Sequence, residues 1–253
     1  MRCITMTQTR MIDRMTLGRS FDSTIEQWLE TARTDGAIAL IDKEENWTSF
    51  DCVAKVRNLT RVKRVGHAGT LDPLATGLLV LCFGKATKDI EELQEGTKTY
   101  EVEILLGADS TTDDRGGACT ERSVEPLPSQ DIISALKSFE GTIQQTPPAF
   151  SAVRHQGRRQ YDLARQGIDF VAKPRIVTIH AIEDVSVSWP LVRCAITCSR
   201  GTYIRSIARD LGVKLGCGGY VWSLRRTASG QHRVDDALRI DEIRTLLVPG
   251  EDA

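Results

Sequence analysis

One segment of the chain places residue types that could do chemistry in a rigid loop. Residues 66–79, GHAGTLDPLATGLL, follow a basic run at residues 61–64 and lead into an apolar stretch. Within this segment Asp72 precedes Pro73, and a residue before proline is held in an extended conformation. Asp72 would therefore present its carboxylate in a fixed direction. An Asp-Pro pair is also a common way to begin a turn, and on local composition alone the turn is the favoured interpretation.

The spacing of the histidines and cysteines does not predict a metal site. The four histidines lie far apart, and none of the seven cysteines belongs to a CxxC pair, whereas zinc sites need His or Cys ligands at short spacing. Scattered cysteines in odd number do not fit a disulfide framework, so we expect a reducing, cytoplasmic location. Cys194 and Cys198 alternate with Val192 and Ile196, which predicts a strand face that buries both thiols as small hydrophobic groups.

The composition indicates a globular protein. The chain has 253 residues, of which 41% are hydrophobic and 26% charged, as in ordinary soluble domains. No apolar stretch is long enough for a transmembrane helix, and the N-terminus lacks the apolar core of a signal peptide. All four methionines fall in the first 15 residues, together with three arginines and one acid. We interpret this start as a disordered arm or a misassigned start codon rather than a transit peptide.

The hydrophobic periodicity predicts interspersed strands and helices. Residues Ser23 to Glu26 fit a capping box that opens a short helix through Trp28 and Leu29. Further helices are predicted at 50–59, 130–139 (capped by Ser129) and 204–215 (closed by Gly216), and strands at 38–41, 78–83, 101–106, 176–187 and 192–198. These elements follow no regular βαβ rhythm, and no Gly-rich phosphate loop is present. The sequence therefore predicts an α/β protein of the α+β type, with a mixed sheet flanked by helices.

Several motifs together resemble one known family. Residues 66–79 closely resemble the signature of the bacterial tRNA pseudouridine synthase B (TruB) family, and the motif is too long for a chance match. Other motifs occur in the order of the family: Asp42-Lys43 with Thr48-Ser49, 98–100 (KTY), 106–117, 147–152 (PPAFSA) with Gly157 and Tyr161, 174–179, 198–205 (CSRGTYIR) with 210–212, and 224–226 (LRR). The resemblance covers about residues 36–235.

The resemblance implies a reaction and a fold. The family isomerises the T-loop uridine conventionally numbered 55 to pseudouridine, without cofactor or metal, in a pseudouridine synthase fold whose sheet is mainly antiparallel. By resemblance, Asp72 starts the reaction, either by attacking the sugar or by removing its 2′ proton. It must be ionised to act, and Arg205 is the cation that would hold its pKa low. Without the motifs, Arg205 would be interpreted as a solvated charge on a helix.

The remaining site residues also follow from the resemblance. Tyr100 would stack over the uracil and assist the final proton loss. Tyr203 and Leu224 would line the base pocket, and His67 would occupy the gap left by the flipped uridine. Taken alone, Tyr100 reads as a half-packed strand residue and His67 as an ordinary loop histidine.

The resemblance also divides the chain into parts. We expect residues 1–35 to form a partly disordered N-terminal extension and residues 36–247 the catalytic domain. Within it, 143–167 would be a thumb-like RNA-binding insertion, with a flexible charged loop as the competing interpretation. The small PUA-like C-terminal domain of many members is expected to be absent. The opening motif of the family usually has Pro and Gly where this chain has Glu44 and Asn46.

The distribution of charge matters more than its total. With 33 basic and 34 acidic residues, the formal net charge of -1 argues against a nucleic-acid-binding protein. However, residues 57–67, 153–165 and 200–226 together hold 14 cations and two acids. If these three segments converge on one face, they would form a basic cleft whose affinity for RNA falls steeply with salt.

We therefore expect a stand-alone, monomeric enzyme that binds the T arm of tRNA and needs no protein partner, membrane or cofactor. One alternative is a non-catalytic factor that binds or folds tRNA on the same scaffold. Another is a guide-RNA-dependent catalytic subunit, which shares the core motifs but normally carries the C-terminal domain. The variant Asp72→Asn separates the enzyme from the non-catalytic factor, because only the enzyme would lose an activity.

Overall fold

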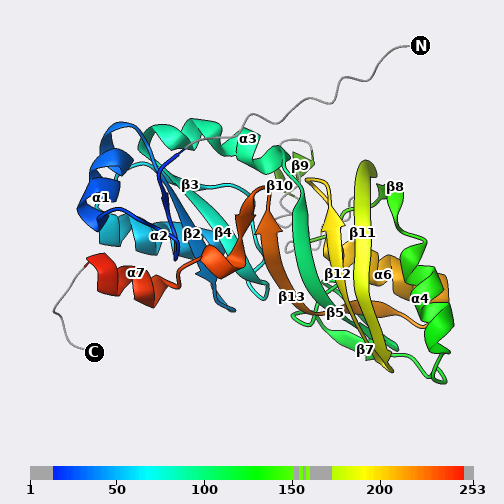
Figure 1. Cartoon of the computed structure of the whole chain (residues 1–253). Helices are drawn as coiled ribbons and strands as arrows, with labels where there is room; N and C mark the ends of the chain where they lie inside the picture. The colour runs from blue at the N-terminus through cyan, green and yellow to red at the C-terminus, as the bar shows by residue number, and fades with distance from the viewer. Residues whose placement is uncertain (1–13, 151–153, 156–157, 160–172, 248–253) are drawn as a thin grey trace, which may run out of the picture. The chain divides into compact units, whose positions relative to one another are not determined.

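The computed structural model of the protein describes residues 14–150, 154–155, 158–159 and 173–247 (Figure 1). The chain divides into two compact units. Unit 1 consists of residues 1–96 and 228–253, and unit 2 of residues 97–227. The boundaries predicted at residues 35, 143, 167 and 247 remain predictions. Much of the predicted RNA-binding insertion, including Tyr161, lies outside the described residues, as does Cys3.

Unit 1 is built on a short sheet. Strand β2 (Ile38–Lys43) pairs antiparallel with β4 (Thr76–Phe83), which also pairs antiparallel with β3 (Val65–His67). Strand β1 (Thr16–Leu17) runs parallel to β2. In β4 every residue after Thr76 is buried, as expected for the continuous apolar run at 78–83. Side chains of β2 and β4 form a hydrophobic core with Ala68, Val234 and Ala237.

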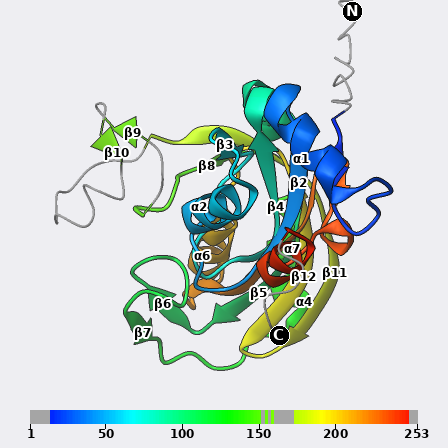
Figure 2. The same cartoon turned by 90° about the vertical axis from the view of Figure 1, so that its left-hand side faces the viewer.

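The described helices of unit 1 are α1 (Ile25–Thr34), α2 (Ser49–Thr60), α3 (Ile90–Glu95) and α7 (Ile240–Leu247), with the 3₁₀ helices η1 (Gly84–Asp89) and η2 (Val234–Asp236). Helices α1 and α2 both begin at capping boxes. Helix α2 packs beside β3 and α7 (Figure 2). The predicted cap of α1 was wrong by one residue: the capping box joins Thr24 and Gln27, not Ser23 and Glu26. Both pairs fit the cap pattern, and the cap at Thr24 accompanies complete burial of Trp28.

Unit 2 is a larger antiparallel sheet. Its strand order is β13 (Gly219–Ser229), β5 (Lys98–Leu106), β12 (Leu191–Cys198), β11 (Arg175–Ser188) and β8 (Gly141–Gln145). The last two residues of β13 belong to unit 1, where they pair with β14 (His232–Arg233). Two short hairpins accompany the sheet, β6 (Ala108–Ser110) with β7 (Cys119–Glu121), and β9 (Arg154–His155) with β10 (Arg158–Arg159).

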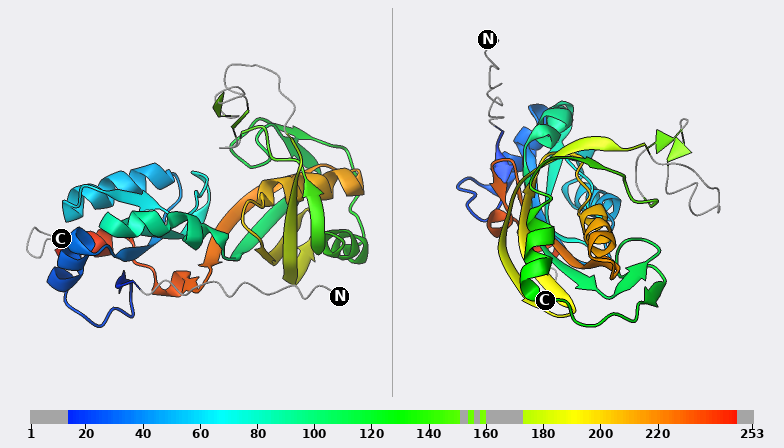
Figure 3. Two further views of the ribbon diagram at one scale, coloured as in Figure 1. Left: turned by 90° about the horizontal axis from the view of Figure 1, so that it is seen from above. Right: turned by 90° about the vertical axis from the view of Figure 1, so that its right-hand side faces the viewer.

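Two helices cover the core of unit 2. Helix α6 (Ile204–Leu215) lies against β5, and α4 (Ser129–Lys137) lies against β11 and α6 (Figure 3). Helix α6 ends at Gly216 with a φ of 72°, as expected for a left-handed cap. The predicted cap of α4 was wrong. Pro128 is the N-cap and makes no side-chain hydrogen bond, and Ser129 is already the first helical residue.

The predicted fold class is confirmed, since a mainly antiparallel mixed sheet is flanked by helices. Cys194 and Cys198 are buried as expected, and burial raises their pKa values to about 12 and about 11. Strand β13 was not predicted, because Arg225 and Arg226 interrupt its apolar pattern. No helix in the described part of the chain is both long and apolar enough to cross a membrane.

Candidate active site

The loop that carries Asp72 connects β3 to β4 in unit 1, and the residues on either side of Asp72 are both anchored. We call residues 68–75 the Asp72 loop. Before Asp72, the amide of Leu71 donates to Ser49 Oγ at 2.9 Å, and Ser49 Oγ donates back to the Leu71 carbonyl at 3.1 Å. After it, the Pro73 carbonyl accepts from Lys43 Nζ at 3.1 Å and from the Asn46 amide at 2.9 Å. Asp72 itself is half-buried. Its backbone is therefore fixed at two neighbouring points.

Lys43 ties this loop to the turn that follows β2. Its ammonium group is completely buried and donates to the carbonyls of Glu44 at 2.9 Å, Trp47 at 2.7 Å and Pro73 at 3.1 Å. A buried ammonium is costly unless its donors are satisfied, and an ammonium group has three N–H donors. Lys43 and Ser49 belong to the opening motif, so this motif holds the Asp72 loop in unit 1.

The two departures from the family in that turn have physical explanations. Asn46 has a φ of 65°, in the left-handed region where Gly is easiest and Asn is the best-tolerated alternative. Glu44 forms an ion pair with Arg239, which a proline there could not make. The turn therefore satisfies the same backbone requirement with different residues.

His67 is the last residue of β3, where it pairs with Leu81 of β4. It lies one residue before the Asp72 loop and is half-buried. Unit 1 therefore carries two of the predicted site residues. His67 ends β3, and Asp72 lies in the loop that leads from β3 to β4.

Tyr100 and Leu224 lie on neighbouring strands of unit 2. Tyr100 is on β5, opposite Ile196 of β12, and Leu224 is on β13. Both side chains are partly buried and pack against the hydrophobic core of this unit. Tyr100 is therefore a half-packed strand residue, as its local sequence indicates. Its role over the uracil stays a prediction.

Two buried cations flank these residues along the same strands. Lys98 precedes Tyr100 by two residues and Arg226 follows Leu224 by two, so each cation shares a strand face with its neighbour. Lys98 is 6% exposed and Arg226 only 1%. Burial and, to a smaller extent, the nearby Arg226 lower the pKa of Lys98 to about 8. This part of unit 2 therefore places two cationic side chains in a poorly hydrated setting.

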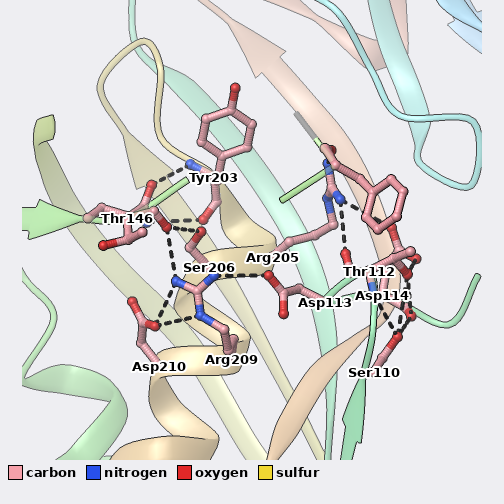
Figure 4. Close-up of polar contacts among 12 residues, drawn as sticks. Ser110, Thr112, Asp113, Asp114, Thr146, Tyr203, Arg205, Ser206, Arg209 and Asp210 are labelled. Atoms are coloured by element: carbon pink, nitrogen blue, oxygen red, sulfur yellow. Dashed lines mark hydrogen bonds and ion pairs between the residues drawn. The ribbon is translucent and has the colours of Figure 1, made fainter. Parts of the chain in front are cut away.

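Tyr203 and Arg205 begin helix α6. Tyr203 is the N-cap, and in place of a side-chain cap its amide donates to Gln145 Oε1 at 2.8 Å while Gln145 Nε2 donates to its carbonyl at 3.1 Å. Arg205 is 5% exposed. It donates from Nη1 to the Thr112 carbonyl at 3.0 Å and from Nη2 to the Phe150 carbonyl at 2.9 Å, and its Nη1 lies 3.7 Å from Asp114 Oδ2 (Figure 4). The default interpretation of Arg205 as a solvated charge was wrong.

Arg209, one turn further along α6, makes a second set of contacts. Its Nη1 lies 3.0 Å from Asp113 Oδ2, its Nη2 donates to the Thr146 carbonyl at 2.9 Å, and its Nε donates to Asp210 at 2.9 Å. Ser206 Oγ donates to the same Thr146 carbonyl at 2.8 Å. Burial raises the pKa of Asp113, and the guanidinium groups of Arg209 and Arg205 oppose this rise.

The predicted site residues are thus divided between the units. His67 and Asp72 belong to unit 1, and Tyr100, Tyr203, Arg205 and Leu224 belong to unit 2. The predicted pairing of Asp72 with Arg205 and the predicted convergence of the basic segments remain predictions. The sequence predicted no role for four polar residues that anchor the Asp72 loop and the start of α6: Lys43, Ser49, Gln145 and Arg209. Only Lys43 has a recognisable sequence pattern, because it is a charged residue at the end of an apolar strand.

The residues that the structure describes contain no cluster of three or more His, Cys, Asp or Glu side chains suited to a metal ion. Of their six cysteines, Cys119 is exposed and the other five are buried.

Comparisons with known proteins agree with the motifs. A family model for the TruB family pseudouridylate synthase N-terminal domain matches residues 57–204, and one for the tRNA pseudouridylate synthase B C-terminal domain matches residues 205–252. A tRNA pseudouridine synthase B from Clostridium kluyveri is 43% identical over 201 residues, which cover 79% of this chain and 70% of that protein. The protein of the same name from Dehalococcoides mccartyi is 45% identical over 212 residues, covering 83% and 71%.

Solved structures also match this chain, at lower identity. A crystal structure of a Cbf5-Nop10-Gar1 complex matches with a TM-score of 0.67 and 26% identity, over 94% of this chain and 66% of that one. An H/ACA RNP bound to a substrate RNA containing 2′-deoxyuridine matches with a TM-score of 0.64 and 25% identity. This chain spans less than two thirds of either solved chain. The resemblance seen in the motifs is confirmed, and the chain belongs to the TruB family of tRNA pseudouridine synthases, isomerases that act on uridine in tRNA.

Proposed function

We propose that this protein converts uridine-55 in the T loop of tRNA to pseudouridine, and that Asp72 initiates the reaction. The glycosidic bond between N1 and C1′ breaks, the uracil rotates while bound, and C5 bonds to C1′. The observation that carries the proposal is the anchoring of Leu71 and Pro73 on either side of Asp72. A carboxylate on so constrained a backbone can be aimed at one atom of a bound substrate, which is what positioning contributes to catalysis.

Arg205 is the proposed counter-charge of Asp72. The carboxylate must be ionised either to attack the sugar or to remove its 2′ proton, and a nearby cation favours the ionised form. The guanidinium of Arg205 is bound to the carbonyls of Thr112 and Phe150 and is almost fully buried. A fixed cation in a poorly hydrated setting stabilises a neighbouring anion more than a solvated cation does. The burial of Arg205 therefore supports its role as the counter-charge of Asp72.

The substrate base is proposed to leave its stack before it reacts. Tyr100 stacks on the flipped uracil, with its hydroxyl near C5 for the final proton loss, while Tyr203 and Leu224 line the pocket. His67 fills the gap in the T loop and offsets part of the cost of unstacking. The partly buried, core-packed positions of Tyr100 and Leu224 support an apolar base pocket in unit 2.

The protein is proposed to act alone, as a monomer in the cytoplasm, on the T arm. A guide-RNA-dependent subunit is the less favoured alternative, because the relatives named tRNA pseudouridine synthase B are 43% and 45% identical while the chain in the H/ACA RNP is 25% identical. A non-catalytic tRNA-folding factor is disfavoured by the presence of Asp72, Tyr100 and Arg205 together.

The test is incubation of the purified protein with an unmodified tRNA transcript, followed by mapping of pseudouridine. We expect product at position 55 without a guide RNA, and we expect Asp72→Asn to form none while it binds the transcript within about threefold of the wild-type affinity. Asp22→Asn, which makes the same substitution at an exposed position of unit 1, is the matched control and should retain full activity.

Each part of the proposal has its own contrary outcome. Product outside the T loop would overturn the substrate assignment but not the reaction. Modification by Asp72→Asn at the wild-type rate would remove Asp72 from the mechanism. Product that forms only when a guide RNA is added would favour the guide-dependent alternative.

A further inference from the structure

Two arginines on α6 bind the same two segments of unit 2 at different points. We call Arg205 and Arg209 the α6 arginine pair. Each binds one residue of the 110–114 loop, at Thr112 for Arg205 and at Asp113 for Arg209. Each also binds one carbonyl after β8, at Phe150 for Arg205 and at Thr146 for Arg209. Figure 4 shows the pair projecting from successive turns of α6 toward these segments.

Arg209 makes contacts that a simple surface charge would not. Its side chain is 27% exposed, and that of its partner Asp113 is 14% exposed. All three nitrogens of its guanidinium have acceptors: Nη1 binds Asp113, Nη2 binds Thr146, and both Nε and Nη2 lie 2.9 Å from Asp210 Oδ1. A planar guanidinium presents its five N–H donors in a rigid fork, whereas the three donors of an ammonium group rotate about a single nitrogen. Charge-assisted hydrogen bonds in such partly buried positions are among the stronger ones.

The points bound by Arg209 are close in sequence to the partners of Arg205. Asp113 is covalently next to Thr112, and Thr146 lies four residues before Phe150. A shift of either point would therefore displace a carbonyl on which the Arg205 guanidinium rests. Ser206 and Gln145 add hydrogen bonds at the same end of α6, so Arg209 completes a set of contacts that fixes both segments to the helix.

We propose that Arg209 is a positioning residue for the reaction, and that it acts through Arg205. It holds residues 110–114 and 146–150 against α6, so that the Arg205 guanidinium keeps one orientation. This inference rests on the proposed function, in which Arg205 is the counter-charge of Asp72. It predicts that loss of Arg209 slows the chemical step while RNA binding is retained.

The experiment measures single-turnover pseudouridine formation and tRNA affinity for the full-length protein. For Arg209→Met we expect the rate constant to fall about ten- to a hundredfold, the range for a catalytic group displaced by a fraction of an ångström to an ångström, with the dissociation constant within about twofold. Arg209→Lys keeps the charge without the planar fork and should recover part of the lost rate. A merely structural role would not produce this split between rate and affinity.

A matched control comes from the same unit. Arg122 pairs with Asp109 at 2.5 Å, with side chains 50% and 42% exposed, at the β6–β7 hairpin and not at α6. Arg122→Met removes the same kind of ion pair and should leave both the rate constant and the affinity unchanged.

A second variant keeps the inference testable if Arg209→Met folds poorly. Asp113→Asn preserves the shape of the acceptor and removes its charge, and it should slow the reaction in the same direction. Both substitutions disrupt the same contact, between Arg209 and Asp113. The double variant should therefore be no slower than Arg209→Met alone. Additive losses, an unimpaired Arg209→Met, or a defect confined to RNA affinity would overturn the inference. An inactive wild-type protein would instead overturn the proposed function, and this inference with it.

Discussion

The Asp72 loop of unit 1 and the segments bound by the α6 arginine pair in unit 2 are held by different kinds of contact. Around Asp72 the acceptors are main-chain carbonyls and one hydroxyl, and the donors are amides, a hydroxyl and the buried ammonium of Lys43. In unit 2 two guanidinium groups bind carbonyls and also the carboxylates of Asp113 and Asp210.

The two sets of contacts differ in whether their acceptors can titrate. A carbonyl does not change its charge with pH, so the carbonyls of Leu71 and Pro73 that accept these bonds are the same at every pH. Asp113 does titrate, and burial raises the pKa of its carboxyl above the usual value. The Asp72 loop is therefore held by acceptors whose charge is constant. The loop that contacts Arg205 is held in part by Asp113, an acceptor whose charge depends on pH.

Removing the ammonium of Lys43 is the substitution that should affect unit 1 most. In Lys43→Met the carbonyls of Glu44, Trp47 and Pro73 lose a buried donor. We expect the free energy of unfolding to fall by about 2–4 kcal/mol, because unsatisfied buried polar groups are costly and the lost bonds are charge-assisted. Urea denaturation measures this loss.

The control is Lys85→Met, at an exposed ion pair with Asp35. It should change the free energy of unfolding by less than about 0.5 kcal/mol. Equal losses in the two variants would show that the carbonyl contacts of Lys43 are unimportant.

Removing Arg209 should have a pH-dependent effect on stability. In Arg209→Met the Asp113 carboxyl is left buried without its main counter-charge, so its pKa rises further. A carboxyl whose folded pKa is raised destabilises the folded state at high pH, and this penalty disappears as the pH falls through that pKa. We expect a loss of about 1–3 kcal/mol near pH 8 and a clearly smaller loss near pH 5.

The double variant provides the control for that pH dependence. Asp113→Asn in the Arg209→Met background removes the unpaired charge, and it should restore part of the stability near pH 8 and abolish the difference between the two pH values. Denaturation curves for the three proteins decide the matter. A loss that is independent of pH would mean that Asp113 is not the group responsible.

Ser49→Ala should produce a smaller loss, in unit 1. The hydroxyl of Ser49 both accepts from and donates to the main chain of Leu71, and its removal leaves two buried groups without that partner. We expect a cost of about 1–2 kcal/mol that does not vary between about pH 5 and pH 8, because neither partner titrates in that range. A pH-dependent cost would contradict the distinction between the two units.

The smallest effect is expected at Asn46. Because its φ of 65° is readily adopted by Gly, Asn46→Gly should change the free energy of unfolding by less than about 0.5 kcal/mol, whereas Asn46→Val should cost about 1–2 kcal/mol. Thermal unfolding of the two variants is the measurement. Equal stability of both variants would show that the turn can adopt another backbone conformation.

The sequence predicted the regular elements well where local patterns decide them. The apolar run of β4, the alternation of β12 and the left-handed end of α6 at Gly216 each depend on a few adjacent residues. It missed β13, because Arg225 and Arg226 are buried or half-buried in spite of their charge, and only their tertiary surroundings make that possible. It placed the cap of α1 one residue early, since two overlapping segments fit the same capping pattern.

The sequence by itself determined the family, the six candidate site residues and the rigid setting of Asp72 before a proline. Only the tertiary structure decided what holds those residues. Lys43 is 30 positions from Pro73, and Arg209 is 96 from Asp113 and 63 from Thr146. Contacts over such separations depend on how strands and helices pack within each unit, and neither periodicity nor a local motif records which distant backbone group a buried side chain will meet.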